Sequence, residues 1–428
     1  MEKGLTIVRV SVSKILLCIS IVLLSVPLAL CNTVYIDYTI KRRIEVLAII
    51  MSIMYLMRFI NKSAVIKKTT LLFGIALLTF AACVIYFTNI NAGLIIQEDS
   101  TVTAILDSGV ICSYFLLINK SISTNHFMLI KKTIVVSLGS FVLINDVMLY
   151  LFPELAKIFG GEWWTSFFLG SKFDVGYLHL FFIAALFSTF FQKKSYSKNT
   201  LLVVLLILTA YTTIFVDCNT GIIAVGLFLL FILCTHKIYE IFIKPQVFCG
   251  ILLSSLLFVV AYGVLLNSKI AEFLIQDIFH RDLSLTGRTT IYKLLQTVMT
   301  NNIWTGYGYG IDYNVSQALF NYDNTQNGLM EWILQIGIIG TLMLVILLYI
   351  IFFRIAKAKP SNKIVPMLAF IYVLTIIAMV EISLDLFYFM AIGLLYGMSL
   401  DEEKRIKQKN YKDQSLNRKR LISATAAS

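Results

Sequence analysis

The chain has 428 residues, of which 58% are hydrophobic and 14% charged, and its formal net charge is +12. Soluble domains usually carry about 25% charged residues, so this composition excludes an ordinary soluble domain and predicts a protein that crosses a membrane several times. The apolar runs, such as 201–215 and 250–266, are continuous and do not alternate with polar residues. They predict helices, not the strands of a closed barrel, and the expected fold class is therefore an all-α transmembrane bundle.

The apolar runs predict about twelve spans within a single membrane domain, residues 1–400. They cover residues 14–32, 44–60, 69–90, 101–118, 133–152, 176–192, 200–216, 221–235, 246–267, 329–353, 364–381 and 385–400. An even number places both termini on the same side. A cytoplasmic location for both puts 27 of the 36 Lys and Arg residues in cytoplasmic segments, as expected from the positive-inside rule. The cluster Lys41-Arg42-Arg43 lies outside in this N-in, C-in topology and fits it least well.

Basic cytoplasmic loops account for the net charge, which therefore does not indicate a nucleic-acid partner. Those loops are short, and the sequence contains no glycine-rich phosphate loop. An ATP-driven pump and a cytoplasmic sugar-nucleotide transferase are therefore disfavoured. The seven Cys and four His residues are scattered, which indicates neither a disulfide framework nor a metal site, and no cofactor is expected. We expect the basic tail, 401–428, to be disordered because it has no apolar period.

The first of two substantial outer loops, residues 153–175, contains a Trp-Trp and a Phe-Phe pair. Aromatic residues at this depth are typical of an interfacial belt, and a platform that stacks on sugars, or a lid, is the alternative. Lys157 and Lys172 of this loop are candidates to contact either anionic headgroups or an anionic substrate.

The second outer loop, residues 267–328, is the longest segment that is too polar to lie in lipid. Apolar residues at helical spacing between 291 and 299 predict a helix that lies on the outer membrane surface. Arg288 falls in its first turn, where free N–H groups and the helix dipole favour an anion. The guanidinium of Arg288 can hold two phosphate oxygens, and Arg281 can reach the same anion.

Two further features have structural interpretations. The segment 306–310, Gly-Tyr-Gly-Tyr-Gly, predicts a tight turn because glycine tolerates positive φ. Carboxylates within spans usually indicate function, but Asp107, Glu381 and Asp385 lie near predicted span ends and are explained by position. Asp217 belongs to a predicted polar turn between two spans.

Four short motifs follow one another in this part of the chain: Gly287-Arg288-x-x-Ile291-Tyr292, Gly306-x-Gly308, Gln326-Asn327-x-Leu329 and Gly337-x-x-Gly340. Their order and spacing resemble the C-terminal signature of the O-antigen polymerases and O-antigen ligases. The layout of about twelve spans, with one large outer loop before the last three, is also similar. Two positions depart from the signature: Gln326 stands where the family has His, and Cys218-Asn219 replaces part of a Ser-Arg turn.

The resemblance implies a multi-pass glycosyltransferase of the bacterial cytoplasmic membrane. Its members join oligosaccharide repeat units, carried on undecaprenyl diphosphate, into capsular or O-antigen polysaccharide at the outer face. It further implies that Gly306, Gly308, Gln326 and Asn327 contact the substrate, and that a flippase and a chain-length regulator are protein partners. A ligase that moves finished glycan to another acceptor and a polysaccharide or lipid transporter are the alternatives.

A diphosphate leaving group needs preorganised positive charge, which Arg288 and Arg281 can supply without a metal. Since the family's second basic residue is missing, Arg281, Lys172 and Lys157 are the candidates to replace it. The attacking hydroxyl needs a general base, for which we consider Glu331, His280 and Asp312 in that order.

Overall fold

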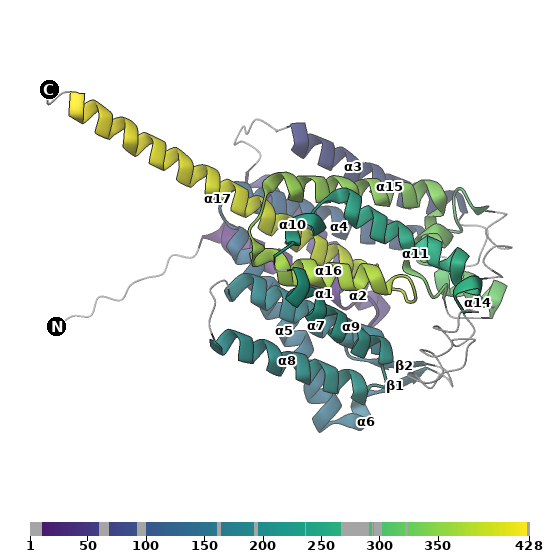
Figure 1. Ribbon diagram of the computed structural model, residues 1–428. Coiled ribbons are helices and arrows are strands. Elements are labelled where there is room, and N and C mark those ends of the chain that lie inside the picture. The colour runs from purple at the N-terminus through teal and green to yellow at the C-terminus, as the bar shows by residue number, and fades with distance from the viewer. Residues whose placement is uncertain are drawn as a thin grey trace.

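The computed structural model describes residues 11–59, 68–91, 100–160, 164–191, 196–235, 237–266, 291–292, 294, 302–321 and 324–425. Helices dominate these residues (Figure 1). The helices are α1 (Val12–Ala29), α2 (Tyr38–Met57), α3 (Lys68–Asn91), α4 (Ser100–Ser123), α5 (Phe127–Leu151), α6 (Pro153–Ala156), α7 (Lys172–Phe190), α8 (Tyr196–Phe215), α9 (Asn219–Thr235), α10 (Tyr239–Phe242), α11 (Pro245–Leu266), α14 (Asp312–Phe320), α15 (Gly328–Ala358), α16 (Val365–Ile377) and α17 (Leu386–Thr425), with a 3₁₀ turn η2 (Asn362–Ile364) before α16.

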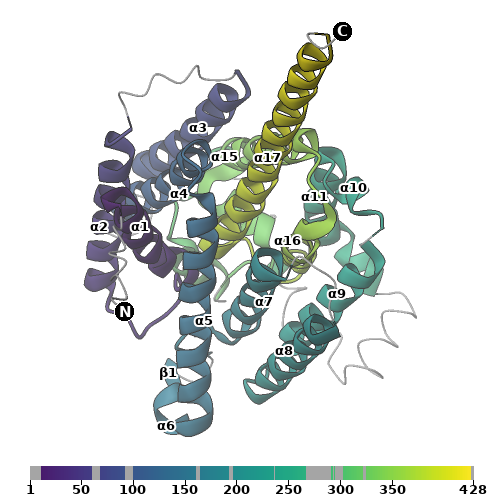
Figure 2. The ribbon, with the colours of Figure 1, turned by 90° about the vertical axis from the view of Figure 1, so that its left-hand side faces the viewer.

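The helices form one bundle around α7, α16 and the first half of α17 (Figure 2). Helix α16 is apolar on all sides and nearly all of its side chains are buried, as expected for a helix in the centre of a bundle. It packs against α7, α9, α11 and α17, while α1 packs on α2 and α5, and α15 on α3 and α11. The start of α1 and the end of α17 lie toward the same end of the bundle (Figure 1).

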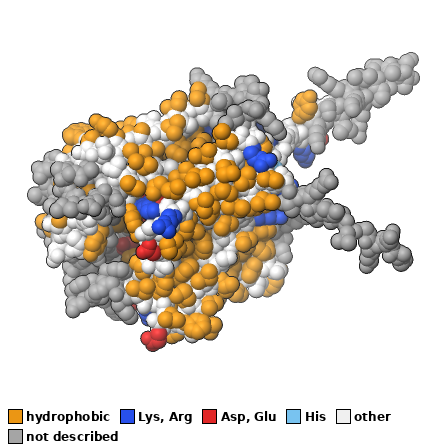
Figure 3. Space-filling view, turned by 180° about the vertical axis from the view of Figure 1, so that it is seen from behind, with side chains coloured by type: hydrophobic (Ala, Val, Ile, Leu, Met, Phe, Trp, Pro, Cys, Tyr) orange, Lys and Arg blue, Asp and Glu red, His pale blue; other side chains and the backbone are white. Residues whose placement is uncertain are grey.

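The coarse prediction of an all-α, multi-pass membrane protein is confirmed. Seven helices of the described residues are long and apolar enough to cross a membrane: α1, α3, α4, α5, α7, α8 and α15. Apolar side chains also cover most of the described surface on the face opposite that of Figure 1 (Figure 3). Each of the twelve predicted spans overlaps a helix, and the seven helices above are those that meet this criterion over their described side chains.

The end of the chain differs from its predicted disorder, because α17 continues as a helix to Thr425 and extends beyond the bundle (Figure 1). The segment lacks an apolar period but is rich in Lys, Arg, Glu and Gln, which favour helix even without a packing partner. Ion pairs one turn apart add support: Arg405 Nη2 lies 2.9 Å from Asp401 Oδ2, and Lys407 pairs with Glu403. The ammonium of Lys404 donates to Asn125 Oδ1 (2.7 Å), which fixes the start of the extension.

The outer segment 153–175 forms a small antiparallel sheet in the order β1-β2-β3: β1 (Ile158–Gly160), β2 (Trp164–Phe167) and β3 (Gly170–Ser171). Its register pairs Phe159 with Thr165 and Phe167 with Gly170. These strands are not predicted from the sequence, because they are too short to show a period of two. The sheet lies at the end of the bundle opposite the α17 extension (Figure 1) and leads directly into α7.

Helix α15 is broken at Gly337, where φ is 67° and ψ is −178°. The turn 302–310 fills the break: Tyr307 N and Gly308 N donate to the carbonyls of residues 334 and 335 (2.8 Å each). In return, the amides of residues 338 and 339 donate to the carbonyls of Ile303 (2.8 Å) and Trp304 (3.3 Å). Backbone groups that the break would leave unpaired in an apolar bundle are thus bonded to the turn. The predicted tight turn is present, with positive φ at Gly306, Gly308 and Gly310.

Within the basic cluster at 41–43, Arg42 is paired with two carboxylates. Arg42 Nη1 lies 2.6 Å from Glu45 Oε2 and 3.2 Å from Asp107 Oδ1, and the Arg42 side chain is only 14% exposed. Lys41 Nζ donates to the carbonyl of Cys31 (2.7 Å). Two of the three charges that fitted the predicted topology least well, Lys41 and Arg42, are thus held in place by a neighbouring carbonyl and neighbouring carboxylates.

Candidate functional site

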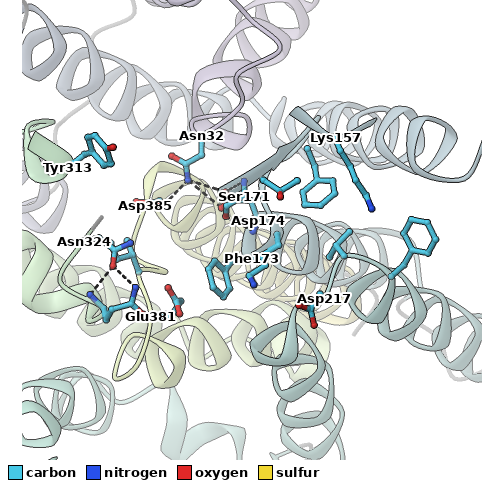
Figure 4. A pocket seen from close by; sticks show the side chains of 17 residues that line it. Asn32, Lys157, Ser171, Phe173, Asp174, Asp217, Tyr313, Asn324, Glu381 and Asp385 are labelled. Atoms are coloured by element: carbon cyan, nitrogen blue, oxygen red, sulfur yellow. Dashed lines mark hydrogen bonds between the residues drawn. The ribbon is translucent and has the colours of Figure 1, made fainter. Parts of the chain in front are cut away.

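A cavity of about 810 Å³ lies at the sheet end of the bundle (Figure 4). Its described lining is Asn32, Lys157, Thr165, Phe167, Ser171, Lys172, Phe173, Asp174, Phe215, Val216, Asp217, Tyr313, Asn324, Gln326, Glu381, Ile382 and Asp385. These residues come from the sheet, the ends of α1 and α8, the start of α7, the segment before α15, helix α14 and the α16–α17 connection. A volume of this size accommodates a few sugar rings or a small-molecule ligand.

One wall of the cavity is a fixed hydrogen-bond network around the start of α7. Ser171 caps this helix in a capping box with Asp174: Asp174 N donates to Ser171 Oγ (3.3 Å), and Ser171 N donates to Asp174 Oδ2 (2.8 Å). The amide of Asn32 donates to Asp174 Oδ2 (3.2 Å) and to Asp385 Oδ2 (3.0 Å). A single amide therefore joins two carboxylates that are distant in sequence.

The α16–α17 connection, residues 378–385, carries Glu381 and Asp385 into this cavity. Its backbone is tied to α15: Gly328 N donates to Ala378 O (2.8 Å), and Trp332 Nε1 donates to Leu384 O (3.1 Å). Ser383 Oγ donates to Leu374 O (2.7 Å). These bonds hold an irregular segment in a buried position, so its carboxylates have defined places.

Asn327 is fully buried and serves as the N-cap of α15. Its Oδ1 accepts from the amides of Leu329 (3.2 Å) and Met330 (3.0 Å), and its Nδ2 donates to the carbonyls of Ser255 and Met379 (3.1 Å each). The side chain thus clamps three elements together, and it does not belong to the described lining of the cavity. Its predicted contact with substrate has no support from this placement.

Gln326, by contrast, lines the cavity in a left-handed conformation, with φ of 53°. Asn324 Oδ1 accepts from both Gln326 N (2.9 Å) and Gln326 Nε2 (2.8 Å). The carbonyl of Gln326 accepts from the hydroxyl of Tyr292 (2.9 Å), which ties the end of the long outer loop to an earlier part of the same loop.

Glu331 is buried at the base of the 324–327 turn. Its Oε2 accepts from the backbone amide of Thr325 (3.2 Å) and from the hydroxyl of the same residue (2.6 Å). It lines a second, smaller cavity of about 160 Å³, which shares Asn32 and Asp385 with the large one. The carboxylate therefore stabilises the turn, and it faces the smaller space and not the larger one.

Two predicted lysines contribute to the large cavity. The ammonium of Lys157 lies 5.6 Å from the centre of the Phe215 ring, and that of Lys172 lies 5.7 Å from the Phe173 ring. Figure 4 shows Lys157 on one side of the cavity and Asn324 and Glu381 on the other. Lysines chosen from one loop and Gln326 from another thus line one space, although more than 150 residues separate them.

Gly306 and Gly308 lie in the turn that fills the break in α15, and neither is part of the described cavity lining. A Cβ on Gly306 would lie 2.5 Å from the carbonyl carbon of Gln335, so this glycine permits close packing of two backbone segments. His280, Arg281 and Arg288 lie outside the described residues, as does the side chain of Asp312.

The sequence did not single out Asn32 or the cavity carboxylates Asp174, Asp217, Glu381 and Asp385 as site residues. The sequence does contain a signal for Glu381 and Asp385, because carboxylates within spans usually indicate function. Position near a span end accounts for Glu381 and Asp385 equally well, because sequence alone does not show that the α16–α17 connection returns into the bundle. Among the described residues, no group of three or more His, Cys, Asp or Glu side chains could hold a metal ion.

Burial and nearby carboxylates raise the pKa values of two groups in the loops. The pKa of the Cys31 thiol lies well above its usual value because of burial, with Asp385 and Asp174 adding to the effect. Burial also raises the pKa of Tyr309, which lines the smaller cavity, and the charges of Asp107 and Asp385 raise it further. Burial and the neighbouring carboxylates thus favour the protonated forms of the Cys31 thiol and the Tyr309 hydroxyl.

A scan of known protein families finds no model that matches this chain, and a search of curated proteins finds no similar sequence. The resemblance to O-antigen polymerases and ligases therefore rests on the four motifs and on the layout of the spans.

Proposed function

We propose that this chain is a polysaccharide polymerase of the bacterial cytoplasmic membrane, which joins repeat units carried on undecaprenyl diphosphate. One observation carries the proposal: Lys157, Lys172 and Gln326, selected from two separate outer loops, line one cavity that also contains carboxylates and amides. Such a lining offers positive charge for a diphosphate, bases for a hydroxyl and hydrogen-bonding groups for sugars.

The same proposal includes twelve spans with both termini in the cytoplasm. It is supported by the common end at which α1 starts and α17 finishes, and by the excess of Lys and Arg in the segments assigned to that side. In this topology the cavity opens at the outer face. Lipid-linked repeat units would reach it there without any nucleotide.

The reaction is a substitution at the anomeric carbon of the donor. The acceptor hydroxyl oxygen forms the new bond to that carbon, the bond to the diphosphate oxygen breaks, and undecaprenyl diphosphate leaves with the bonding electrons. The hydroxyl proton passes to a carboxylate, for which Asp385 is the best placed described residue because it borders both cavities and is oriented by Asn32. Lys157 and Lys172, together with the predicted Arg288 and Arg281, would stabilise the departing diphosphate.

The experiment is glycan chain-length analysis of a deletion strain complemented with variants. We expect the deletion strain and the Lys157→Ala/Lys172→Ala double variant to lose long glycan. Single repeats should persist on their lipid carrier at the outer face. A Lys404→Ala variant, altered at the opposite end of the bundle, is the matched control and should restore long chains. Long glycan in the deletion strain would refute the proposal, and finished glycan retained on the carrier would instead indicate a ligase.

A transporter is the second candidate, because the break at Gly337 resembles the discontinuous helices that form transporter sites. The break is filled by the turn 302–310 and not by a described cavity, which weakens this hypothesis. Repeats trapped on the cytoplasmic face of the deletion strain would favour it over the polymerase.

A further inference from the structure

A third cavity, of about 80 Å³, lies where α17 leaves the bundle, at the end opposite the sheet (Figure 1). It is enclosed by α5, the end of α7, η2 and α17. Its charged and polar lining is Lys131, Ser188, Lys363, Asp401, Glu402 and Arg405. The described lining of the large cavity contains none of these residues, so a ligand here would be separate from the site proposed for the glycan.

The ammonium of Lys131 faces this cavity without a bonded counter-ion. Lys131 is only 5% exposed, and its ammonium lies 5.8 Å from the centre of the Phe127 ring. Within the part of the chain that the structure describes, this ammonium makes no hydrogen bond and no ion pair. A buried cation is costly unless it is paired, so such a group favours an anion beside it.

Ser188 presents a second unsatisfied group to the same space. It is 2% exposed, and its hydroxyl has no hydrogen-bond partner among the described residues. Other buried helical serines bond to a carbonyl one turn back, as Ser20 and Ser25 do (2.7 Å each). An unpaired buried hydroxyl costs free energy that an acceptor in the cavity would restore. Two groups from different helices therefore lack a partner and line one space.

The charges of the described lining leave one positive charge over, since three cations face two carboxylates. Both carboxylates are already bonded to other groups. Asp401 Oδ2 lies 2.9 Å from Arg405 Nη2, and Glu402 Oε2 accepts from the backbone amide of Ser361 (2.9 Å). The lining therefore favours an anion that carries about one negative charge and has several acceptor oxygens.

We propose that this cavity binds a phosphate group, held by the ammonium of Lys131 and the hydroxyl of Ser188. Phosphate oxygens accept hydrogen bonds from several donors at once, and a phosphodiester or a monoanionic phosphate carries the required charge. Lys363 and Arg405 are exposed, so they would contact the phosphate from the solvent side. A phosphate bound here would link α5, α7, η2 and α17.

Two sources can supply this group. In the topology proposed above, this end of the bundle faces the cytoplasm, where basic pockets between helices are typical sites for phospholipid headgroups. Free phosphate in the cytoplasm has the same chemistry. Neither source depends on the glycan, so the inference does not rest on the proposed function.

The test uses the purified full-length protein, stripped of co-purified lipid in a nonionic detergent and a phosphate-free buffer. Its thermal midpoint is measured against inorganic phosphate in one arm and against phosphatidylglycerol in mixed micelles in the other. Sodium chloride at equal ionic strength is the control for the first arm. Diacylglycerol with the same acyl chains, which lacks the phosphate, is the control for the second.

Both arms are repeated with Lys131→Met, Ser188→Ala and Lys132→Met. Lys132 is exposed and does not line the cavity, so its variant is the matched control for the loss of one charge. The readout is the shift that phosphate induces and not the midpoint itself. A purely structural effect of a substitution, which is equal with and without phosphate, therefore does not imitate a loss of binding.

Phosphate in at least one arm should raise the midpoint of the native protein and of Lys132→Met in a saturable way. Lys131→Met should weaken the apparent affinity by about tenfold or more, because it removes a charged donor. Ser188→Ala should weaken it by about threefold or more, because it removes a neutral donor.

A shift with inorganic phosphate identifies free phosphate as sufficient, and a shift with phosphatidylglycerol alone identifies the lipid headgroup. Either result supports the inference when the two cavity variants weaken the shift as expected. If Lys131→Met does not fold, the comparison of Ser188→Ala with the native protein decides. The absence of a shift in both arms, or an equal shift in the native protein and the cavity variants, overturns the inference and leaves the cavity to water.

Discussion

Gly337 is the position at which α15 and the turn 302–310 meet, and replacing it by Ala should destabilise the protein strongly. Its φ of 67° and ψ of −178° belong to a region that only glycine adopts readily, and another residue there costs about 1–3 kcal/mol. A Cβ would also lie 2.2 Å from the carbonyl oxygen of Trp304. The obstacle is backbone, so no side-chain rotation relieves it.

The turn must therefore move away from the break. Doing so loosens four backbone hydrogen bonds, those of the amides of Tyr307, Gly308, Ile338 and Ile339, each with a net contribution of about 1 kcal/mol. Partial relaxation reduces the sum of the backbone strain and the weakened hydrogen bonds. We therefore expect the free energy of unfolding to fall by at least about 3 kcal/mol. For a chain of 428 residues, the usual scaling of unfolding entropy with length converts this loss into a thermal midpoint lower by about 3 °C or more.

The assay is thermal unfolding of the purified protein in one detergent, followed by intrinsic fluorescence. Gly250→Ala is the matched control: this glycine lies in α11 and a Cβ there would meet nothing within 4 Å, so Ala should leave the midpoint unchanged or raise it slightly. If Gly337→Ala and Gly250→Ala have the same midpoint, the packing of the turn into the break does not support the fold.

Three further outcomes follow from the site. Asn32→Ala should reduce glycan polymerisation about tenfold or more at unchanged protein level, because Asp385 loses its orienting donor, and chain-length profiles measure this. Glu331→Gln weakens the bonds from Thr325 and should lower the thermal midpoint while long glycan persists; loss of glycan at full stability would instead identify Glu331 as the base. Removal of residues 408–428 should leave membrane level and glycan length unchanged on immunoblots and gels, because the ion pairs and contacts that fix the start of the extension precede the cut.

The sequence predicts the bundle well because lipid leaves the backbone few choices: an apolar run must bond its own amides and carbonyls, and a helix does so. The same reasoning fails at the ends of spans. Helix α16 stops at Ile377 because its continuation bonds to Gly328 and Asn327 of α15, partners about fifty residues away. Nor does periodicity reveal the short strands near residue 160 or the charged extension of α17.

The roles of the charged groups are also only partly predictable from the sequence. A count of Lys and Arg suffices to propose an orientation, but it treats every cation as solvated. Arg42 is instead bonded to Glu45 and Asp107, so its charge says little about the side of the membrane on which it lies. The sequence likewise explains Asp385 by its position near a predicted span end. Its hydrogen bond from Asn32 depends on the packing of α1 against α17, which the sequence does not show.

The motifs themselves have two different physical meanings. Asn327 caps α15 and clamps two other elements, and Gly306 permits one backbone segment to touch another, so both positions restrict residue type without facing the large cavity. Gln326 does face it, next to residues that no motif includes. A signature of this kind therefore records how the site is held in place as much as what it binds. Substitution at Asn327 would be expected to act through stability, and substitution at Gln326 through substrate binding, so that a comparison of thermal midpoint with glycan length separates the two.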